Sequence, residues 1–362
     1  MRFPKTREMS ISIAQGIPRF QLVGGEIHVD TVTWLGLKVT RNQGGETMVR
    51  FCWVVLSFLV WAWSPWTLGI GYGAEARRVR LSFSSRSNSV IPFQVALVKG
   101  FFKEEELEVE MIQANPRLGA LAVMNGDLDF TTTFGSTLRG ILQGLPLKFV
   151  AVSVKKSDHF LVVRPEIKEF QELKGKKLGV STLLGTDQRA AEEMLRSKGF
   201  NPALLQIMAL GDSPVRAQAL RSGLVEAISI SSPYDLMLKN MGYNVLAGPH
   251  DIKFALPTSG LAVTARLLQE RPQLVKRAIR ALLKAHRFIF ENRRETIQVM
   301  MRWLEQSPEI ADRFYDLALI SLSRDGEITD AEWERLTEKR RPLEEVRDFS
   351  LLREAQKELG LK

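Results

Sequence analysis

The chain has 362 residues, of which 45% are hydrophobic and 25% charged, and its formal net charge is +9. These proportions exclude a disordered or low-complexity chain and are sufficient for two domains with cores of their own. The basic residues are spread among acidic ones, so we expect no nucleic-acid partner, which would need a clustered basic surface.

The first predicted element is an export signal. Residues 51–63 are apolar apart from Ser57, Arg50 precedes them, and the sequence "AEA" follows at 74–76. A basic start, an apolar core and an Ala-x-Ala pattern are the marks of a secretory signal peptide. We expect cleavage near Ala76 and a periplasmic mature protein. An uncleaved membrane anchor is the alternative.

The position of this signal suggests a different start of translation. Met48 would give a signal peptide of the usual form, so we interpret residues 1–47 as a misassigned upstream extension and residues 48–76 as the signal peptide. The single cysteine, Cys52, lies within the signal. The mature chain would then have no thiol, which excludes a disulfide framework, a cysteine nucleophile and a thiolate metal site.

Ten segments after the signal have the apolar, β-branched composition of strands, and most are separated by helical patterns. This alternation predicts mostly parallel sheets with helices on both faces. The strand segments are residues 79–85, 107–114, 128–134, 147–154, 159–164, 177–181, 205–210, 225–231, 244–248 and 259–264.

Two interruptions of this strand–helix alternation indicate crossings between domains. Residues 164–177 are polar and charged, and residues 251–260 have no helical period and contain Pro257 and Gly260. After residue 266 the chain is helical, and we expect those helices to pack on the first domain. We therefore predict two α/β lobes, the second inserted into the first: lobe 1 at 77–165, lobe 2 at 166–257, and a return to lobe 1 with C-terminal helices at 258–362.

Two segments, 130–142 and 180–195, share one design: an apolar strand, a turn of small residues, and a helix. Free N–H groups at helix starts attract acceptor or anionic groups, and Ser, Thr and Gly add short donors and close access. Serine-rich turns also follow strands at 82–89 and 228–235. Since ligands in such folds bind beyond the carboxyl ends of strands, these turns predict a ligand site. Simple helix capping is the alternative.

No pattern predicts a metal, a cofactor or a catalytic centre. The four histidines have no metal-ligand spacing, "DGEITD" lacks the alternating oxygen ligands of a calcium loop, and "LKGKKLG" lacks the glycine and hydroxyl of a phosphate loop. His159, which follows Asp158, is the histidine considered for a catalytic role. We expect no cofactor, no metal and no enzymatic activity.

Five segments carry a family resemblance: "PFQVALVKGFFKEEELEVEMI", "ALAVMNGDLDFT", "GLPLKFVAV", "ELKGKKLGVSTLLGT" and "ALRSGLVEAISISSPYDLMLKNMGYNVL". In this order they resemble the substrate-binding proteins of nitrate, sulfonate, taurine and thiamine-precursor importers, over residues 79–295. The resemblance implies the type II periplasmic binding protein fold, with two α/β lobes and a small-molecule ligand between them. It also implies delivery to an ABC permease and its ATPase, with membrane contact only through that permease or an uncleaved signal.

The resemblance also implies, by position, which residues line the ligand cleft. These are Ser85, Asn88, Phe134, Gly135, Ser136, Ser181, Gly185, Thr186, Ser231, Ser232 and Tyr234. The sequence departs from many relatives at "NPRLGAL" (115–121), where a Gly/Ser-rich turn is usual. There Arg117, or else Arg86, would pair an anionic group or remain solvated. Two other functions stay open: an enzyme on this fold that acts on a small heterocycle or acid, and a ligand-sensing module.

Overall fold

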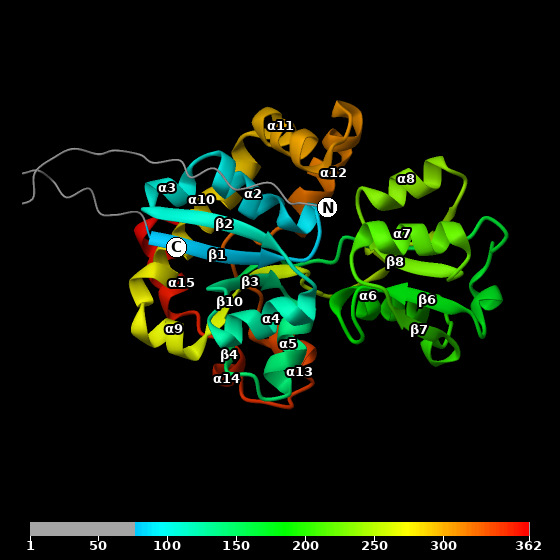
Figure 1. Ribbon diagram of the computed structural model, residues 1–362, viewed down its shortest axis with the longest axis horizontal. Coiled ribbons are helices and arrows are strands. Elements are labelled where there is room, and N and C mark those ends of the chain that lie inside the picture. Colours follow the sequence, from blue (N-terminus) through cyan, green and yellow to red (C-terminus); the bar gives the residue numbers. More distant parts are fainter. Residues whose placement is uncertain (1–76, 362) are drawn as a thin grey trace, which may run out of the picture. The chain divides into compact units, whose positions relative to one another are not determined.

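The computed structural model describes residues 77–361. The predicted upstream extension, the signal peptide with Cys52 and the cleavage site at Ala76 lie outside the described residues. Within 77–361, no helix has the length and apolar character needed to cross a bilayer. The described chain contains two five-stranded sheets, each the centre of one lobe (Figure 1).

The sheet of lobe 1 has the strand order β2-β1-β3-β10-β4, with β10 antiparallel to its two neighbours. Val150, Ala151 and Val152 are all fully buried, as expected for a strand covered by helices on both faces. The strands are β1 (Arg77–Phe83), β2 (Leu107–Gln113), β3 (Phe130–Thr133), β4 (Leu147–Val154) and β10 (Ser259–Thr264).

The sheet of lobe 2 repeats this plan with the order β7-β6-β8-β5-β9, and here β5 is the strand that runs against its neighbours. The strands are β5 (His159–Val163), β6 (Lys177–Val180), β7 (Gln206–Ala209), β8 (Ala227–Ser231) and β9 (Asn244–Ala247). All ten predicted strand segments therefore contain a strand, and the mostly parallel character of both sheets is confirmed.

The first crossing between the lobes lies earlier than predicted. The expected boundary at residue 165 placed β5 in lobe 1, but β5 pairs with β8 and β9 of lobe 2. The crossing is thus the short segment between Val154 and His159. Each crossing leads directly into a strand without an intervening helix, and these two strands, β5 and β10, are the ones that run opposite to the rest of their sheets.

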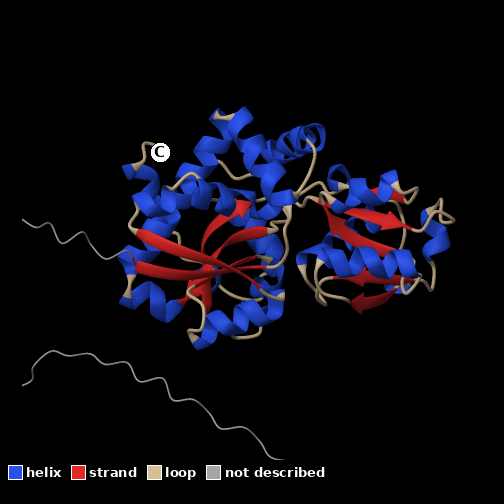
Figure 2. Cartoon of the chain, turned by 45° about the horizontal axis from the view of Figure 1, so that its top comes forward, coloured by secondary structure: helices blue, strands red, loops and turns tan. Residues whose placement is uncertain are grey.

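Helices cover both faces of each sheet (Figure 2). Lobe 1 holds η1 (Asn88–Val90), α2 (Ile91–Val98), α3 (Phe101–Glu104), α4 (Pro116–Asn125), α5 (Gly135–Leu142), α9 (Ala265–Glu270), α10 (Pro272–Glu291), α11 (Arg293–Leu304), α12 (Pro308–Ser321), α13 (Asp330–Thr337), α14 (Leu343–Val346) and α15 (Ser350–Glu358). Lobe 2 holds η2 (Phe170–Leu173), α6 (Thr186–Ser197), η3 (Pro202–Leu204), α7 (Ser213–Ser222), α8 (Tyr234–Asn240) and η4 (Pro249–Asp251).

The helices after β10 complete lobe 1, as the sequence predicts. Trp333 on α13 is fully buried, and its ring lies 5.4 Å from that of Phe134 and 5.6 Å from that of Phe149. Helix α13 begins with a capping box, in which the Thr329 and Glu332 side chains bond each other's backbone. The C-terminal helices are therefore part of the core beneath the β3–α5 turn.

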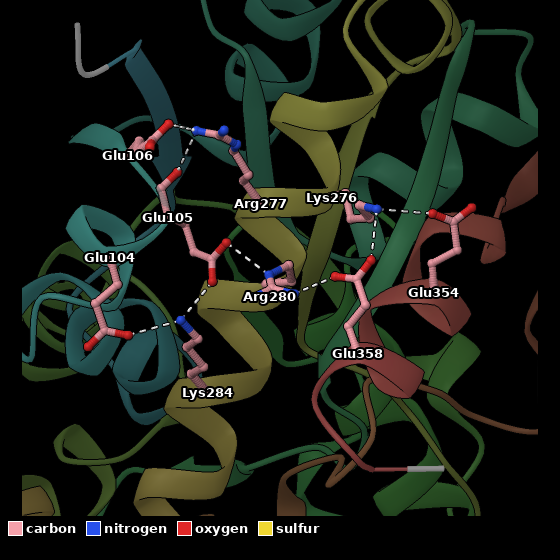
Figure 3. A network of polar contacts seen from close by, with 9 residues as sticks. All are labelled: Glu104, Glu105, Glu106, Lys276, Arg277, Arg280, Lys284, Glu354 and Glu358. Atoms are coloured by element: carbon pink, nitrogen blue, oxygen red, sulfur yellow. Dashed lines mark hydrogen bonds and ion pairs between the residues drawn. The ribbon is translucent and has the colours of Figure 1, made fainter. Parts of the chain in front are cut away.

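The basic face of α10 joins the end of α3 to α15, the last helix of lobe 1 (Figure 3). Its cations bind carboxylates of the α3 end on one side and of α15 on the other, and Arg280 reaches both. Glu105 is the buried member, 2.9 Å from Arg280 and 2.7 Å from Lys284. The network contains Glu104, Glu105, Glu106, Lys276, Arg277, Arg280, Lys284, Glu354 and Glu358. All nine residues belong to lobe 1, so the network stabilises this lobe independently of lobe 2.

Candidate functional site

The two turns singled out in the sequence lie face to face across the two lobes. Ser136 Oγ, in the first turn of α5, is 2.9 Å from Thr182 Oγ1, which precedes α6. A Cβ atom placed on Gly135 would collide with the backbone nitrogen of Thr186. Only glycine permits this approach, because any side chain at position 135 would push the lobes apart. The turns therefore touch directly, and no space for a ligand remains between them at this point.

Two further hydrogen bonds join the lobes around this contact. Thr186 Oγ1 donates to the carbonyl oxygen of Pro257 in the second crossing at 3.1 Å. Arg139 Nη1, on α5, donates to the carbonyl oxygen of Leu183 at 2.5 Å. The hydrogen bond of Thr186 therefore fixes the position of the second crossing. The Thr186 side chain does not cap α6.

Beside the contact lies a small central cavity of about 60 Å³. Hydroxyl groups from both lobes line it, together with His159, Asp187, Asp212 and Arg216. A buried water needs roughly 10–15 Å³ of such space, so this cavity accommodates a few waters. A larger ligand requires the lobes to separate. The cavity brings together seven of the predicted cleft residues: Ser85, Phe134, Gly135, Ser136, Ser181, Thr186 and Ser231.

The other four predicted residues do not line this cavity. Asn88 donates from Nδ2 to the carbonyl oxygen of Phe314 at 3.2 Å, within lobe 1. Ser232 Oγ donates to Asp235 Oδ1 at 2.8 Å. Tyr234 packs against an apolar cluster of lobe 2, and Gly185 is the N-cap residue of α6. Local packing and capping account for each of them.

Phe134 is one of the residues that line the central cavity. Its ring is buried in the core of lobe 1, stacked on Phe149 with 4.4 Å between the ring centroids. A ring held in this way stabilises the turn and offers no aromatic face to a ligand. Phe134 therefore stays among the predicted lining residues of the cleft, while its ring packs in the core of lobe 1.

A buried ion pair supports the lobe 2 wall of the cavity. Arg216 on α7 and Asp187 on α6 are almost completely buried and lie 2.5 Å apart. Asp187 also accepts hydrogen bonds from the backbone N–H and the hydroxyl of Ser181. Arg216 donates to the carbonyl oxygen of Ser229 and to Ser213 Oγ. The pair thus fixes the position of Ser181, although burial lowers the pKa of Arg216.

Neither this ion pair nor the burial of a second acidic group, Asp158, was predicted from the sequence. Asp158 lies in the first crossing and is 1% exposed, and neither carboxylate oxygen has a hydrogen-bond partner among the described residues. Burial raises the pKa of Asp158 to about 7 and lowers that of the adjacent His159 to about 4. The segment that joins the lobes therefore carries an acid that, because of its burial, keeps its proton up to a pH of about 7. Across residues 77–361, no three His, Cys, Asp or Glu side chains are grouped as metal ligands.

Replacing Gly135 by Ala is expected to hold the lobes apart, because the added methyl group collides with Thr186. Small-angle X-ray scattering should show a larger radius of gyration than that of the wild type. The control is Arg294→Gln, on an exposed position of α11, which should leave the radius unchanged. An unchanged radius for Gly135→Ala would mean that the lobes are not in contact in solution.

Comparisons with known proteins agree with this architecture. The family described as NMT1/THI5 like matches residues 87–296. The riboflavin-binding protein RibY of Chloroflexus aurantiacus is 24% identical over 224 residues, which cover 60% of this chain and 63% of RibY. This chain therefore spans less than two thirds of that relative's length.

Solved structures show the same fold. A protein of Bordetella bronchiseptica superposes with a TM-score of 0.68 at 21% identity, over 79% of this chain and 99% of that one. The ligand-binding component of an ABC-type import system from Staphylococcus aureus, solved with zinc, has a TM-score of 0.65 at 15% identity (77% and 99%). The alkanesulfonate-binding protein SsuA of Xanthomonas axonopodis, bound to MOPS, has a TM-score of 0.62 at 16% identity (78% and 98%). The predicted type II periplasmic binding protein fold is confirmed.

Proposed function

The chain belongs to the NMT1/THI5-like family, and we propose that it is the substrate-binding protein of an ABC importer. The observation that carries this proposal is the meeting of two strand-to-helix turns across the lobes, beside a cavity lined by hydroxyl groups. One solved protein of the same fold is described as the ligand-binding component of an ABC-type import system and another as an alkanesulfonate-binding protein, which supports the same role.

In this proposal the protein works in the periplasm after its signal peptide is removed. It captures a small organic or anionic nutrient and presents it to a permease driven by an ATPase. The closed arrangement seen here uses direct bonds between the lobes, such as that of Ser136 with Thr182. A ligand favours the closed state only to the extent that it binds this state better than the open one.

In this proposal the protein binds its ligand without converting it to a product, and the surroundings of His159 support that view. Ser157 Oγ lies 3.1 Å from His159 Nδ1, and Asp158 Oδ1 lies 3.7 Å from the same nitrogen. A Ser-His-Asp triad needs the two partners on opposite ring nitrogens. With a pKa of about 4, His159 is also a weak general base at neutral pH.

The experiment that tests the proposal begins with mass spectrometry of the native protein, which should show a small molecule that co-purifies. Calorimetry with that molecule should then give an affinity for Ser231→Ala that is roughly three- to tenfold weaker than for wild type, since a cavity hydroxyl is lost. The molecule itself should remain chemically unchanged.

The neighbouring residue provides a matched control. Ser232 bonds Asp235 and not the cavity, so Ser232→Ala should keep full affinity while it lowers the free energy of unfolding. Equal affinities of wild type and Ser231→Ala, or conversion of the bound molecule to a product, would contradict the proposal.

A further inference from the structure

A second and larger cavity adjoins the central one. Its volume is about 620 Å³, and it lies between α4 and α5 of lobe 1 and the β6–α6 turn of lobe 2. Ser136, Ser181 and Gly211 line both cavities, so the two are continuous neighbours along the interlobe cleft. Its volume is within the range of small-molecule pockets, roughly 300–1,000 Å³. We refer to it as the side cavity.

The side cavity has a surplus of positive charge. Arg117 and Arg139 line it, and no Asp or Glu is among its described lining residues. Within residues 77–361, the Arg117 side chain makes no hydrogen bond or ion pair. Arg139 uses Nη1 on the carbonyl oxygen of Leu183, and its other nitrogens have no partner in that range. Two guanidinium groups that lack carboxylate partners favour an anion, which they can bind with paired N–H donors.

Local structure fixes the backbone of Arg117, a lining residue of this cavity, at the start of α4. Asn115 caps α4 by accepting from the backbone N–H of Arg117 at 3.0 Å. The ten-residue helix that begins at Pro116 adds the positive end of its dipole on the same side. The alternative residue, Arg86, is already used, since it lies 2.6 Å from Glu305 and 5.2 Å from the Trp303 ring centroid.

The side cavity also has apolar lining residues. Leu121 and Leu145 line it from lobe 1, and Leu183 lines it from lobe 2. Leu183 and its neighbour Leu184 are each about half exposed, at 50% and 51%. Leu184 has a φ of +60°, a left-handed backbone conformation that is unusual for leucine. Strained backbone of this kind concentrates at ligand-binding segments.

The central cavity has the opposite electrostatic character. Asp187 and Arg216 neutralise each other there, and Asp212 adds a negative charge. A negatively charged group is therefore favoured in the side cavity and disfavoured in the central one.

We infer that the side cavity binds an organic anion, whose carboxylate, sulfonate or phosphate group contacts Arg117 and Arg139 while its apolar body packs on Leu121, Leu145 and Leu183. This inference rests on the proposed function, because it assigns the ligand class of the same interlobe cleft. Arg117 and Arg139 are then the residues that select for negative charge.

The test uses two fluorescent probes with the same aromatic body. 1-Anilinonaphthalene-8-sulfonate carries a sulfonate, and N-phenyl-1-naphthylamine lacks it. The sulfonate probe should bind the wild type with one site per chain, and its dissociation constant should rise at least tenfold in Arg117→Gln. Arg139→Gln should weaken it similarly, while Arg294→Gln, the exposed control, should not. Affinity for the neutral probe should be the same in all four proteins.

The outcomes separate this inference from the proposed function. The inference would be overturned if the sulfonate probe bound the wild type and Arg117→Gln with equal affinity. It would also be overturned if Ser231→Ala weakened binding of the probe and neither arginine variant did. In both cases the proposed function would still stand if a co-purified ligand bound more weakly to Ser231→Ala than to the wild type. If instead the probe depends on the arginines but no ligand co-purifies, the anion site stands and the proposed function does not gain support. Arg117→Gln breaks no bond within residues 77–361, so misfolding does not obscure the result.

Discussion

Replacing Asp158 by Asn is expected to stabilise the protein, and increasingly so as the pH rises. In the folded state burial raises the pKa of Asp158 from 3.8 to about 7. The folded protein therefore keeps a proton that the unfolded chain releases between these values, and stability is lost as the pH rises through 7. One pKa unit corresponds to about 1.4 kcal/mol, so the advantage of Asn should grow by roughly 3 kcal/mol between pH 5 and pH 8.5.

Urea unfolding of both proteins at pH 5, 7 and 8.5 measures this difference. Asp127→Asn serves as the control, since Asp127 is exposed and should show no such trend. Measurements stay at or above pH 5 because His159, with a pKa of about 4, begins to protonate below that value. If Asp158→Asn is less stable than wild type at pH 8.5, the carboxylate is ionised and paired in the folded protein.

Replacing Arg216 by Met is expected to cost about 3–5 kcal/mol of stability, because it leaves the carboxylate of Asp187 buried without its cation. The double variant Asp187→Leu/Arg216→Met removes both charges and should recover most of this loss. Chemical unfolding at neutral pH gives the three free energies, and their non-additivity measures the coupling of the pair.

Helix α7 offers a matched control for this change. Arg221 lies in the last turn of the same helix and is exposed, so Arg221→Met should change stability by less than about 0.5 kcal/mol. A double variant as unstable as Arg216→Met would show that the charges are not coupled. Arg216→Met should also weaken ligand binding, because Asp187 positions Ser181.

The strands could be predicted because their sequences carry the required signal locally. Residues 147–154 and 259–264 are mostly apolar or β-branched, and β4 and β10 span the same residues. The contact between the two turns was also predictable in outline, since small hydroxyl residues follow strand ends that meet at the edge of a parallel sheet.

The buried pair was not predictable in this way. Asp187 and Arg216 lie on different helices, 29 residues apart, and a charged residue within a helix is ordinarily part of a solvated helix face. Their burial depends on how α6 and α7 rotate against the sheet, which a hydrophobic pattern does not specify when the buried position is itself charged.

The first crossing was misplaced for a related reason. The segment between Val154 and His159 is short and polar, which is typical of a turn between neighbouring strands of one sheet. The longer polar segment at 164–177 therefore looked like the better boundary. Strand pairing decides between them, and the pairing of β5 with β8 involves residues far apart in the chain.

The register of β4 and β10 gives lobe 2 a simple topological origin. Val154, the last residue of β4, is paired with Ser259, the first residue of β10, in the antiparallel ladder. Lobe 2 is thus an insertion at the tip of a β-hairpin, and a two-residue turn such as Asn-Gly would be enough to join the two strands without it. Lobe 1 keeps every strand of its sheet in such a shortened chain. Lobe 2 is thus an inserted module, which evolution or protein engineering can exchange at one point of the hairpin of lobe 1.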